Sequence, residues 1–174
     1  METRIDDKTF EKAVSELKER IFLVMLRFTR NREDAYDLTQ EAFIKAYSAR
    51  HTFRGSSSLY TWIYKIAINL AINFKVRDKA SKFASIDEST ELAASGKTSD
   101  DLMRAELRAN IDEAISKLPA RQKMVFLLHY HDEKPHAEIA ALLGITEGAV
   151  KANYHQAVKK LRLYLGRYMR EGEK

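Results

Sequence analysis

Apolar residues recur at helical spacing through the first part of this chain. Three stretches carry such a stripe: residues 10–29, 34–49 and 58–79. The second stripe is narrow and consists mainly of alanine, which permits close packing between helices. In the third stretch the positions expected to face inward are Leu59, Trp62, Ile63, Ile66, Leu70 and Phe74. The pattern predicts a first helical domain over residues 1–80.

The helical periodicity is lost over residues 80–100, where serine, glycine and scattered acids have the composition of a linker. Helical spacing returns over residues 101–118, and Pro119 suits the first turn of the helix that follows. We therefore predict an all-α fold of two small helical domains. A flexible linker is expected at 81–103 and a C-terminal helix-turn-helix domain at 104–174.

The most distinctive pattern lies in residues 136–165 and predicts a helix-turn-helix. Gly144 follows a short apolar stripe, and glycine accepts the left-handed backbone that ends a helix. Thr146 is then placed to cap a second helix. One face of that helix is apolar, and the other carries Lys151, His155, Lys159 and Arg162. This polarity suits a recognition helix in a DNA groove, which we favour over an ordinary helical hairpin with a solvated basic face.

The amino-acid composition agrees with a helical protein and excludes several kinds of site and of membrane segment. The chain of 174 residues has only 6 Gly and 2 Pro, and 45% of it is hydrophobic, enough for cores in both domains. The absence of cysteine excludes disulfides, thiol redox sensing and Cys-ligated zinc. No apolar run is long enough to span a membrane, and the N-terminus lacks a signal-peptide core. We expect a cytoplasmic protein without direct membrane insertion.

The net charge of +5 is distributed in blocks. Basic residues dominate positions 41–82 and the C-terminal part, whereas acids dominate positions 87–113. Two basic blocks separated by an acidic one suggest two surfaces for an anionic partner, although a single solvated surface could look similar.

No catalytic set emerges from the sequence. There is no Gly-rich phosphate loop, and the serines at 56–58 lack an evident His/Asp partner set. A metal site could be suspected at three nearby histidines, His129, His131 and His136. However, residues two apart on a helix point to different sides, and the third histidine lies beyond Pro135. We expect no enzymatic activity, no metal and no cofactor.

The second predicted helix carries a polar stripe away from its small apolar face. It consists of Asp37, Gln40, Glu41 and Ile44. Such a stripe suits docking to a basic helical partner, but spacing alone favours a solvated helix face.

The third predicted helix carries a polar spiral on an otherwise apolar surface. Its members, each four residues apart, are Thr61, Lys65, Asn69, Asn73 and Arg77. Asparagine is unfavourable inside a helix, but its amide can donate and accept at base edges. The loop before the helix offers His51, Phe53 and Arg54 beside serines, where a single-stranded base could be held. Trp62 and Tyr64 could also stack on bases, but Trp62 lies on the apolar stripe and is expected in the core.

Three segments in this order resemble the bacterial extracytoplasmic-function (ECF) sigma factors of RNA polymerase. The family's core-polymerase-binding motif is similar to DLTQEAFIKAY (37–47). Its promoter-melting and −10-reading segment is similar to FRGSSSLYTWIYKIAINLAINFKVR (53–77). Its −35-reading domain is similar to LPARQKMVFLLHYHDEKPHAEIAALLGITEGAVKANYHQAVKKL (118–161). The resemblance implies a factor that binds core RNA polymerase and promoter DNA, reads both elements and helps melt the −10 region.

The resemblance also implies roles for individual residues. Contacts to core polymerase would come from Asp37, Gln40, Glu41 and Ile44. Contacts to −10 DNA would come from Phe53, Arg54, Ser56, Ser57, Lys65, Asn69, Asn73, Lys75 and Arg77. Contacts to −35 DNA would come from Glu147, Gly148, Lys151, Asn153, His155, Gln156, Lys159, Lys160 and Arg162. The resemblance also implies an anti-sigma partner, which could hold the protein at the membrane. It further implies that the free protein is a monomer.

The chain departs from the family in its predicted recognition helix. Family members commonly show a Ser-Arg pair and a later Arg where this chain has Ala152, Asn153 and Gln156. Arginine favours guanine edges, whereas Asn and Gln suit adenine. We therefore expect an altered −35 preference or a weaker −35 contribution.

Two other classes of protein share parts of this pattern. A free-standing helix-turn-helix regulator, with an N-terminal sensing or dimerisation module, would bind duplex operators without polymerase. A protein-binding helical adaptor would use its basic faces only as solvated surface.

Overall fold

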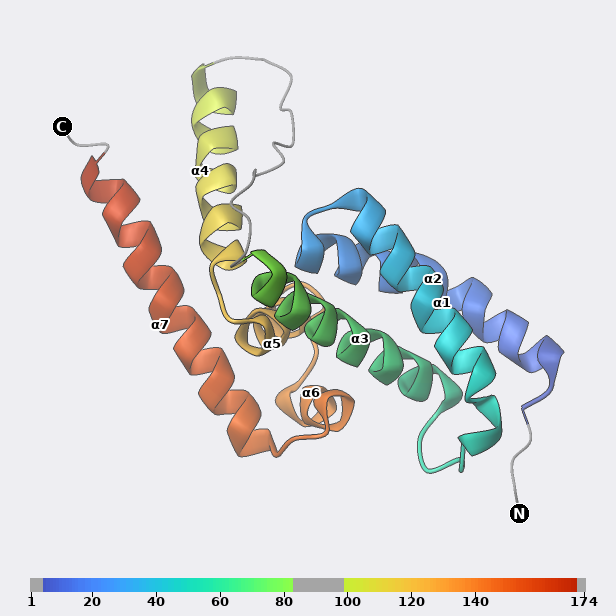
Figure 1. The fold of residues 1–174 in the computed structure, drawn as a ribbon. Helices are drawn as coiled ribbons and strands as arrows, with labels where there is room; N and C mark the ends of the chain where they lie inside the picture. The colour runs from blue at the N-terminus through green and yellow to red at the C-terminus, as the bar shows by residue number, and fades with distance from the viewer. Residues whose placement is uncertain (1–4, 83–98, 172–174) are drawn as a thin grey trace.

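The computed structural model describes residues 5–82 and 99–171. Within them, α1 (Asp7–Thr29), α2 (Arg32–Ser48) and α3 (Leu59–Lys82) form an N-terminal bundle. A short 3₁₀ turn, η1 (Arg50–Thr52), leads from α2 into the loop before α3. Figure 1 shows α1 and α2 side by side, with α3 running beneath them toward the rest of the chain.

The ends of the first helices follow from local capping. The Asp6 carboxylate accepts a hydrogen bond of 2.6 Å from the backbone N–H of Thr9 and so begins α1. Arg30 ends α1 in the left-handed region at φ 60°, and Asn31 immediately caps α2 through the N–H groups of Glu33 and Asp34. The break between the two helices is therefore shorter than the predicted one, because one residue turns the chain and the next starts the new helix.

The second group of helices, α4 (Ser99–Ser116), α5 (Ala120–Tyr130), α6 (His136–Leu143) and α7 (Glu147–Glu171), forms a C-terminal bundle. In Figure 1, α7 runs along the outer side of this bundle. Pro119 stands at the N-cap of α5 with ψ 143°, one position before the first turn where it was predicted. The N–H of the cap residue needs no partner inside the helix, so proline is accommodated there.

The fold class is confirmed: every regular element among the described residues is a helix, and no strand occurs among them. The predicted flexible linker falls mostly on residues 83–98, which lie outside the described part of the chain. The outer parts of the predicted linker range, 81–82 and 99–103, are helical in α3 and α4. No helix in the described ranges is long and apolar enough to cross a membrane.

Helix α3 contacts α1 and α2 of its own bundle and also α5 and α6 of the C-terminal bundle. Its buried surface is therefore wider than the predicted stripe. Ile63 and Leu70 are buried as expected, whereas Leu59, Trp62, Ile66 and Phe74 are only partly buried. The buried positions also include Tyr64, Ala67, Ile68, Ala71 and Ile72. A pattern that assumes one buried face cannot show this second contact surface.

Candidate nucleic-acid interface

The polar stripe on α2 is exposed. Asp37, Gln40 and Glu41 all face solvent, and the Ile44 side chain is 64% exposed. Glu41 pairs with Lys45 at 2.7 Å along the same helix, a contact between two half-exposed side chains that contributes little to stability. An accessible isoleucine beside carboxylates is available for a protein partner.

The loop before α3 is anchored by an aromatic contact. Phe53 is 9% exposed, and its ring meets the ring of Trp62 edge-on, with centroids 5.6 Å apart. In this structure the phenyl ring therefore positions the loop and is not presented to solvent. The neighbouring side chains Arg54, Ser56 and Ser57 are exposed.

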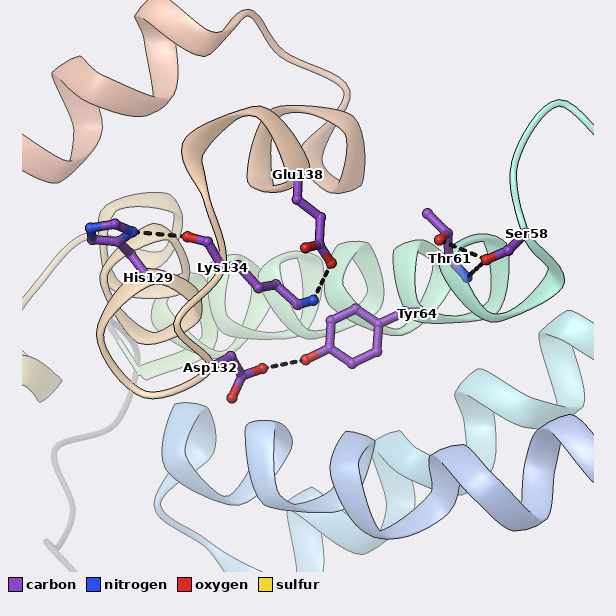
Figure 2. Close-up of polar contacts among 7 residues, drawn as sticks. All are labelled: Ser58, Thr61, Tyr64, His129, Asp132, Lys134 and Glu138. Atoms are coloured by element: carbon purple, nitrogen blue, oxygen red, sulfur yellow. Dashed lines mark hydrogen bonds and ion pairs between the residues drawn. The ribbon is translucent and has the colours of Figure 1, made fainter.

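Ser58 fixes the start of α3. Its Oγ accepts a hydrogen bond of 3.1 Å from the backbone N–H of Thr61 and also lies 2.9 Å from the Thr61 hydroxyl (Figure 2). This serine therefore caps α3. Ser56 and Ser57 remain on the exposed part of the loop.

A groove of about 440 Å³ follows the polar spiral of α3. Its apolar lining comes from Trp62, Ile66 and Leu70, and its polar lining from Lys45, Lys65, Asn69 and Asn73. The Asn69 amide nitrogen donates to the Lys65 carbonyl at 2.9 Å, which orients the side chain along the helix. The groove combines an aromatic surface, two amides and two cations, the chemistry that suits an unstacked base and its phosphate.

Two expected −10 residues lie farther along α3. Lys75 is partly buried, and its positive charge lowers the pKa of Lys123 on α5 of the C-terminal bundle. The side chain of Arg77 lies outside the described part of the structure. Of the predicted set, the structure brings Lys65, Asn69 and Asn73 together in one groove.

The helix-turn-helix forms as predicted. Gly144 ends α6 at φ 64°, and the Thr146 hydroxyl accepts a hydrogen bond of 3.1 Å from the N–H of Ala149 at the start of α7. Ile145 is partly buried against the core. On the inner side of α7, Val150 and Ala157 are fully buried and Leu161 is 8% exposed.

The outer side of α7 carries most of the expected −35 residues. The exposed ones are Glu147, Gly148, Lys151, His155, Gln156, Lys159 and Arg162. Glu147 and Lys151 pair at 3.0 Å. Asn153 is half-buried and donates its amide to the Ala149 carbonyl at 2.8 Å, and Lys160 is also half-buried. A shallow pocket of about 530 Å³ runs along this helix, lined by Tyr154, His155, Val158, Lys159, Arg162 and Leu163.

The three histidines considered for a metal separate into a pair and a single residue. His129 and His136 face one another with ring centroids 4.6 Å apart, and Tyr154 meets His129 edge-on at 4.6 Å. The Nδ1 atom of His129 lies 2.9 Å from the Lys134 carbonyl oxygen. His131 is exposed beside Tyr130. The ring contacts place the pair among the packed side chains of α5, α6 and α7. Among the described residues there is no group of three or more metal-ligating side chains.

Sequence reasoning missed a polar contact between the bundles. Tyr64 of α3 donates its hydroxyl to the Asp132 carboxylate at 2.6 Å, across 68 positions of sequence (Figure 2). Burial, followed by the Asp132 carboxylate, raises the pKa of Tyr64 well above its usual value, so its hydroxyl stays a donor. Tyr64, which the sequence offered for base stacking, is instead buried at this contact. It lies off the predicted stripe, and Asp132 belongs to a polar loop, so neither position indicated the contact.

Comparison with known protein families separates the chain into two parts. The model described as "Sigma-70 region 2" matches residues 13–81, which cover α1 to α3. The model described as "Sigma-70, region 4" matches residues 108–161 and includes the helix-turn-helix. The chain is also 31% identical to the ECF RNA polymerase sigma factor SigW of Bacillus subtilis, over 92% of this chain and 90% of that protein.

The chain belongs to the ECF sigma factors. A second relative, the ECF RNA polymerase sigma-E factor of Escherichia coli, is 32% identical over 87% of this chain and 84% of its own length. The fold of this sigma factor is similar to that of the sigma factor RpoE from Bartonella quintana, solved in complex with the anti-sigma factor NepR. That likeness has a TM-score of 0.67 at 20% identity and covers 91% of this chain and 98% of the other.

Proposed function

We propose that this ECF sigma factor is a non-enzymatic initiation factor that binds core RNA polymerase and directs it to promoters through the −10 and −35 elements. One observation carries the proposal: a single chain presents a groove of about 440 Å³ on α3 and an exposed polar face on α7. Residues 1–80 would bind polymerase and the −10 element, residues 104–174 would bind the −35 element, and 81–103 would link them.

Core polymerase binding is assigned to the α2 stripe of Asp37, Gln40, Glu41 and Ile44. All four side chains are exposed, and Ile44 offers the apolar contact that a stable interface requires at its centre. The surrounding carboxylates favour a basic partner surface.

Contact with the melted −10 strand is assigned to the α3 groove and the loop before it. A base displaced from the duplex can stack on the groove's apolar lining while Asn69 and Asn73 meet its polar edge. Lys65, Lys75 and Arg77 would contact the backbone, and Arg54, Ser56 and Ser57 would contact the base held by the loop. Phe53 is assigned a positioning role there through its contact with Trp62.

Contact with −35 DNA is assigned to the outer face of α7. Lys151, His155 and Gln156 would meet base edges, because they are exposed in the N-terminal half of α7 and a recognition helix uses its N-terminal residues in this way. Lys159, Lys160 and Arg162 lie farther along and would meet phosphates. Because Asn153 already donates to its own helix, its contribution to base reading would be limited.

An anti-sigma factor is proposed as the regulatory partner, as in the complex of the RpoE relative with NepR. The free protein is proposed to be monomeric and cytoplasmic, with membrane location only through that partner.

In vitro transcription with purified core polymerase tests the proposal. Promoter-specific transcripts that require this protein support it, whereas tight operator binding without polymerase would favour a free-standing regulator. Ile44→Ala should weaken core binding, because it removes an exposed apolar contact without disturbing the fold. Leu23→Ala, which trims a 39% exposed side chain on α1, is the matched control and should leave binding unchanged.

A further inference from the structure

An arginine fixes the turn between α2 and α3. Arg50 is the first residue of η1, which leads into the loop assigned to the −10 strand, and none of the residues of η1 is buried. The Arg50 guanidinium lies over the ring of Tyr47 on α2, 3.8 Å from the ring centre. One of its nitrogens also donates a hydrogen bond of 2.9 Å to the Tyr47 carbonyl. Polar contacts of this side chain therefore hold a turn that contributes nothing to the core.

The start of α1 completes the arrangement. Asp7, the first residue of α1, accepts a hydrogen bond of 3.1 Å from the Tyr47 hydroxyl and lies 3.8 Å from the Nε atom of Arg50. One turn later the buried ring of Phe10 meets the Tyr47 ring at 65°, with centroids 5.3 Å apart. Figure 1 shows the start of α1 and the turn between α2 and α3 at the same end of the bundle. We call Asp7, Tyr47 and Arg50 the clasp.

The clasp is connected to the −10 loop through the backbone of Arg50. The Arg50 carbonyl accepts a hydrogen bond of 3.3 Å from the backbone N–H of Phe53. The Phe53 ring in turn packs against Trp62, which lines the α3 groove. The position of Arg50 thus bears on the groove through one intervening residue, the same residue from which the exposed part of the loop begins.

The contacts of the clasp lie at the surface. The side chains of Arg50 and Asp7 are 33% and 68% exposed, and Tyr47 is 41% exposed. An open hollow of about 430 Å³ adjoins them, lined by Ile5, Asp6, Asp7, Arg50 and His51. An ion pair in such a place contributes little to the stability of the whole fold. Its effect is local, because it fixes the direction in which the turn leaves α2.

Resting on the proposed function, we propose that the clasp positions the −10 loop. Asp7, Tyr47 and Arg50 hold residues 53–58 in the geometry that receives the displaced base, without touching the DNA strand themselves. A mobile loop would lose its freedom on binding, and a loop fixed beforehand avoids most of that loss. The clasp therefore raises the preference for the correct −10 sequence.

Direct binding of a phosphate is the other role open to an arginine beside a DNA-binding loop. In that role Asp7 would compete with the strand for the guanidinium, so Asp7→Asn would strengthen binding to every sequence. In the clasp, Asp7→Asn weakens binding to the correct sequence, because Arg50 loses its anchor on α1. The two roles predict effects of opposite sign for the same substitution.

Loop mobility in the full chain, without polymerase, is the first measurement. The sequence has no cysteine, so a nitroxide can be attached at Ser56→Cys in the loop, with Ser15→Cys on α1 as a reference. Arg50→Ala should increase the mobility of the loop label and leave the reference label unchanged. Arg32→Ala is the matched control, because its guanidinium lies 5.6 Å from the Phe22 ring centre at the other end of α2. A loop label equally mobile in the wild type and in Arg50→Ala overturns the proposal.

Binding of single-stranded DNA to the polymerase-bound protein is the second measurement. The probes are oligonucleotides that the wild type selects from a randomised pool, and scrambled versions of them. Arg50→Ala should lower the preference for the selected strand about tenfold, and Asp7→Asn about threefold. Neither should alter the dependence on salt. An equal loss for both probes, with a salt slope smaller by about 0.7, would instead show that Arg50 binds a phosphate and overturns the proposal.

Conservative variants separate positioning from a loss of folding. Arg50→Lys keeps the charge but lacks the planar group that stacks on Tyr47, so it should retain the salt slope and lose most of the preference. Asp7→Asn changes an exposed side chain and keeps the test available where Arg50→Ala fails to fold. A mobile loop with wild-type preference overturns the positioning role. If the wild type selects no strand and supports no promoter-specific transcription, the proposed function fails, while the loop label still decides whether the clasp holds the loop.

Discussion

Phe53 and Trp62 form an edge-to-face pair, with ring planes at 62° and centroids 5.6 Å apart, that ties the loop after η1 to the first turns of α3. The pair joins a buried side chain of the loop to Trp62, which lines the groove on α3. The loop is thus anchored next to the surface assigned to melted DNA, and its exposed serines and Arg54 are held at that edge.

Phe53→Ala should destabilise the protein by about 3 kcal/mol, since it removes a buried phenyl ring and leaves a cavity beside Trp62. Chemical denaturation followed by tryptophan fluorescence measures the loss, as the chain has one tryptophan. Phe53→Leu should recover much of the stability and bind single-stranded −10 DNA nearly as well as the wild type. A stable Phe53→Leu protein that no longer binds this strand would instead place the ring directly on a base.

Much of this arrangement could be predicted from the sequence because it depends on local rules. Gly144 and Thr146 mark the turn of the helix-turn-helix through backbone conformation and capping, which act over a few residues. The exposed stripe on α2 follows from helical spacing in the same way.

The contact between the bundles could not be predicted, because it joins positions far apart in the chain. Tyr64 lies next to the stripe expected to be buried, and its residue type does not reveal a partner. Lys123 is a lysine, a residue type that is usually exposed. Their burial depends on where α5 and the following loop meet α1 and α3, which no periodicity within one helix records.

Lys123→Met should raise the free energy of unfolding near neutral pH, by up to about 5 kcal/mol if the whole pKa shift is relieved. The wild-type lysine has a folded-state pKa of about 7 against an unfolded value near 10.5. The unfolded chain therefore binds more protons between these values, and wild-type stability should rise with pH across that window. Urea denaturation at pH 7, 8 and 9 measures the slope. Equal slopes for the two proteins would show that the buried amine stays protonated.

Thr146→Ala should cost about 1 kcal/mol, because the N–H of Ala149 loses its side-chain acceptor at the start of α7. Thr146→Ser keeps the hydroxyl and should restore most of the stability, which distinguishes capping from packing of the threonine methyl group. Denaturant titration of the three proteins gives the comparison. A serine variant as unstable as the alanine variant would contradict the capping role.

Asn153→Arg should shift the −35 preference of the polymerase-bound protein toward guanine, by about tenfold or more at the contacted position. The native amide is half-buried and donates to the Ala149 carbonyl, whereas an arginine can extend past the helix surface and bind a guanine edge with two hydrogen bonds. Binding to promoters with randomised −35 elements measures the preference. Leu163→Arg adds the same charge at a 60% exposed position farther along α7, and should raise affinity for all sequences alike. If Asn153→Arg behaves like this control, the side chain at position 153 does not meet a base edge.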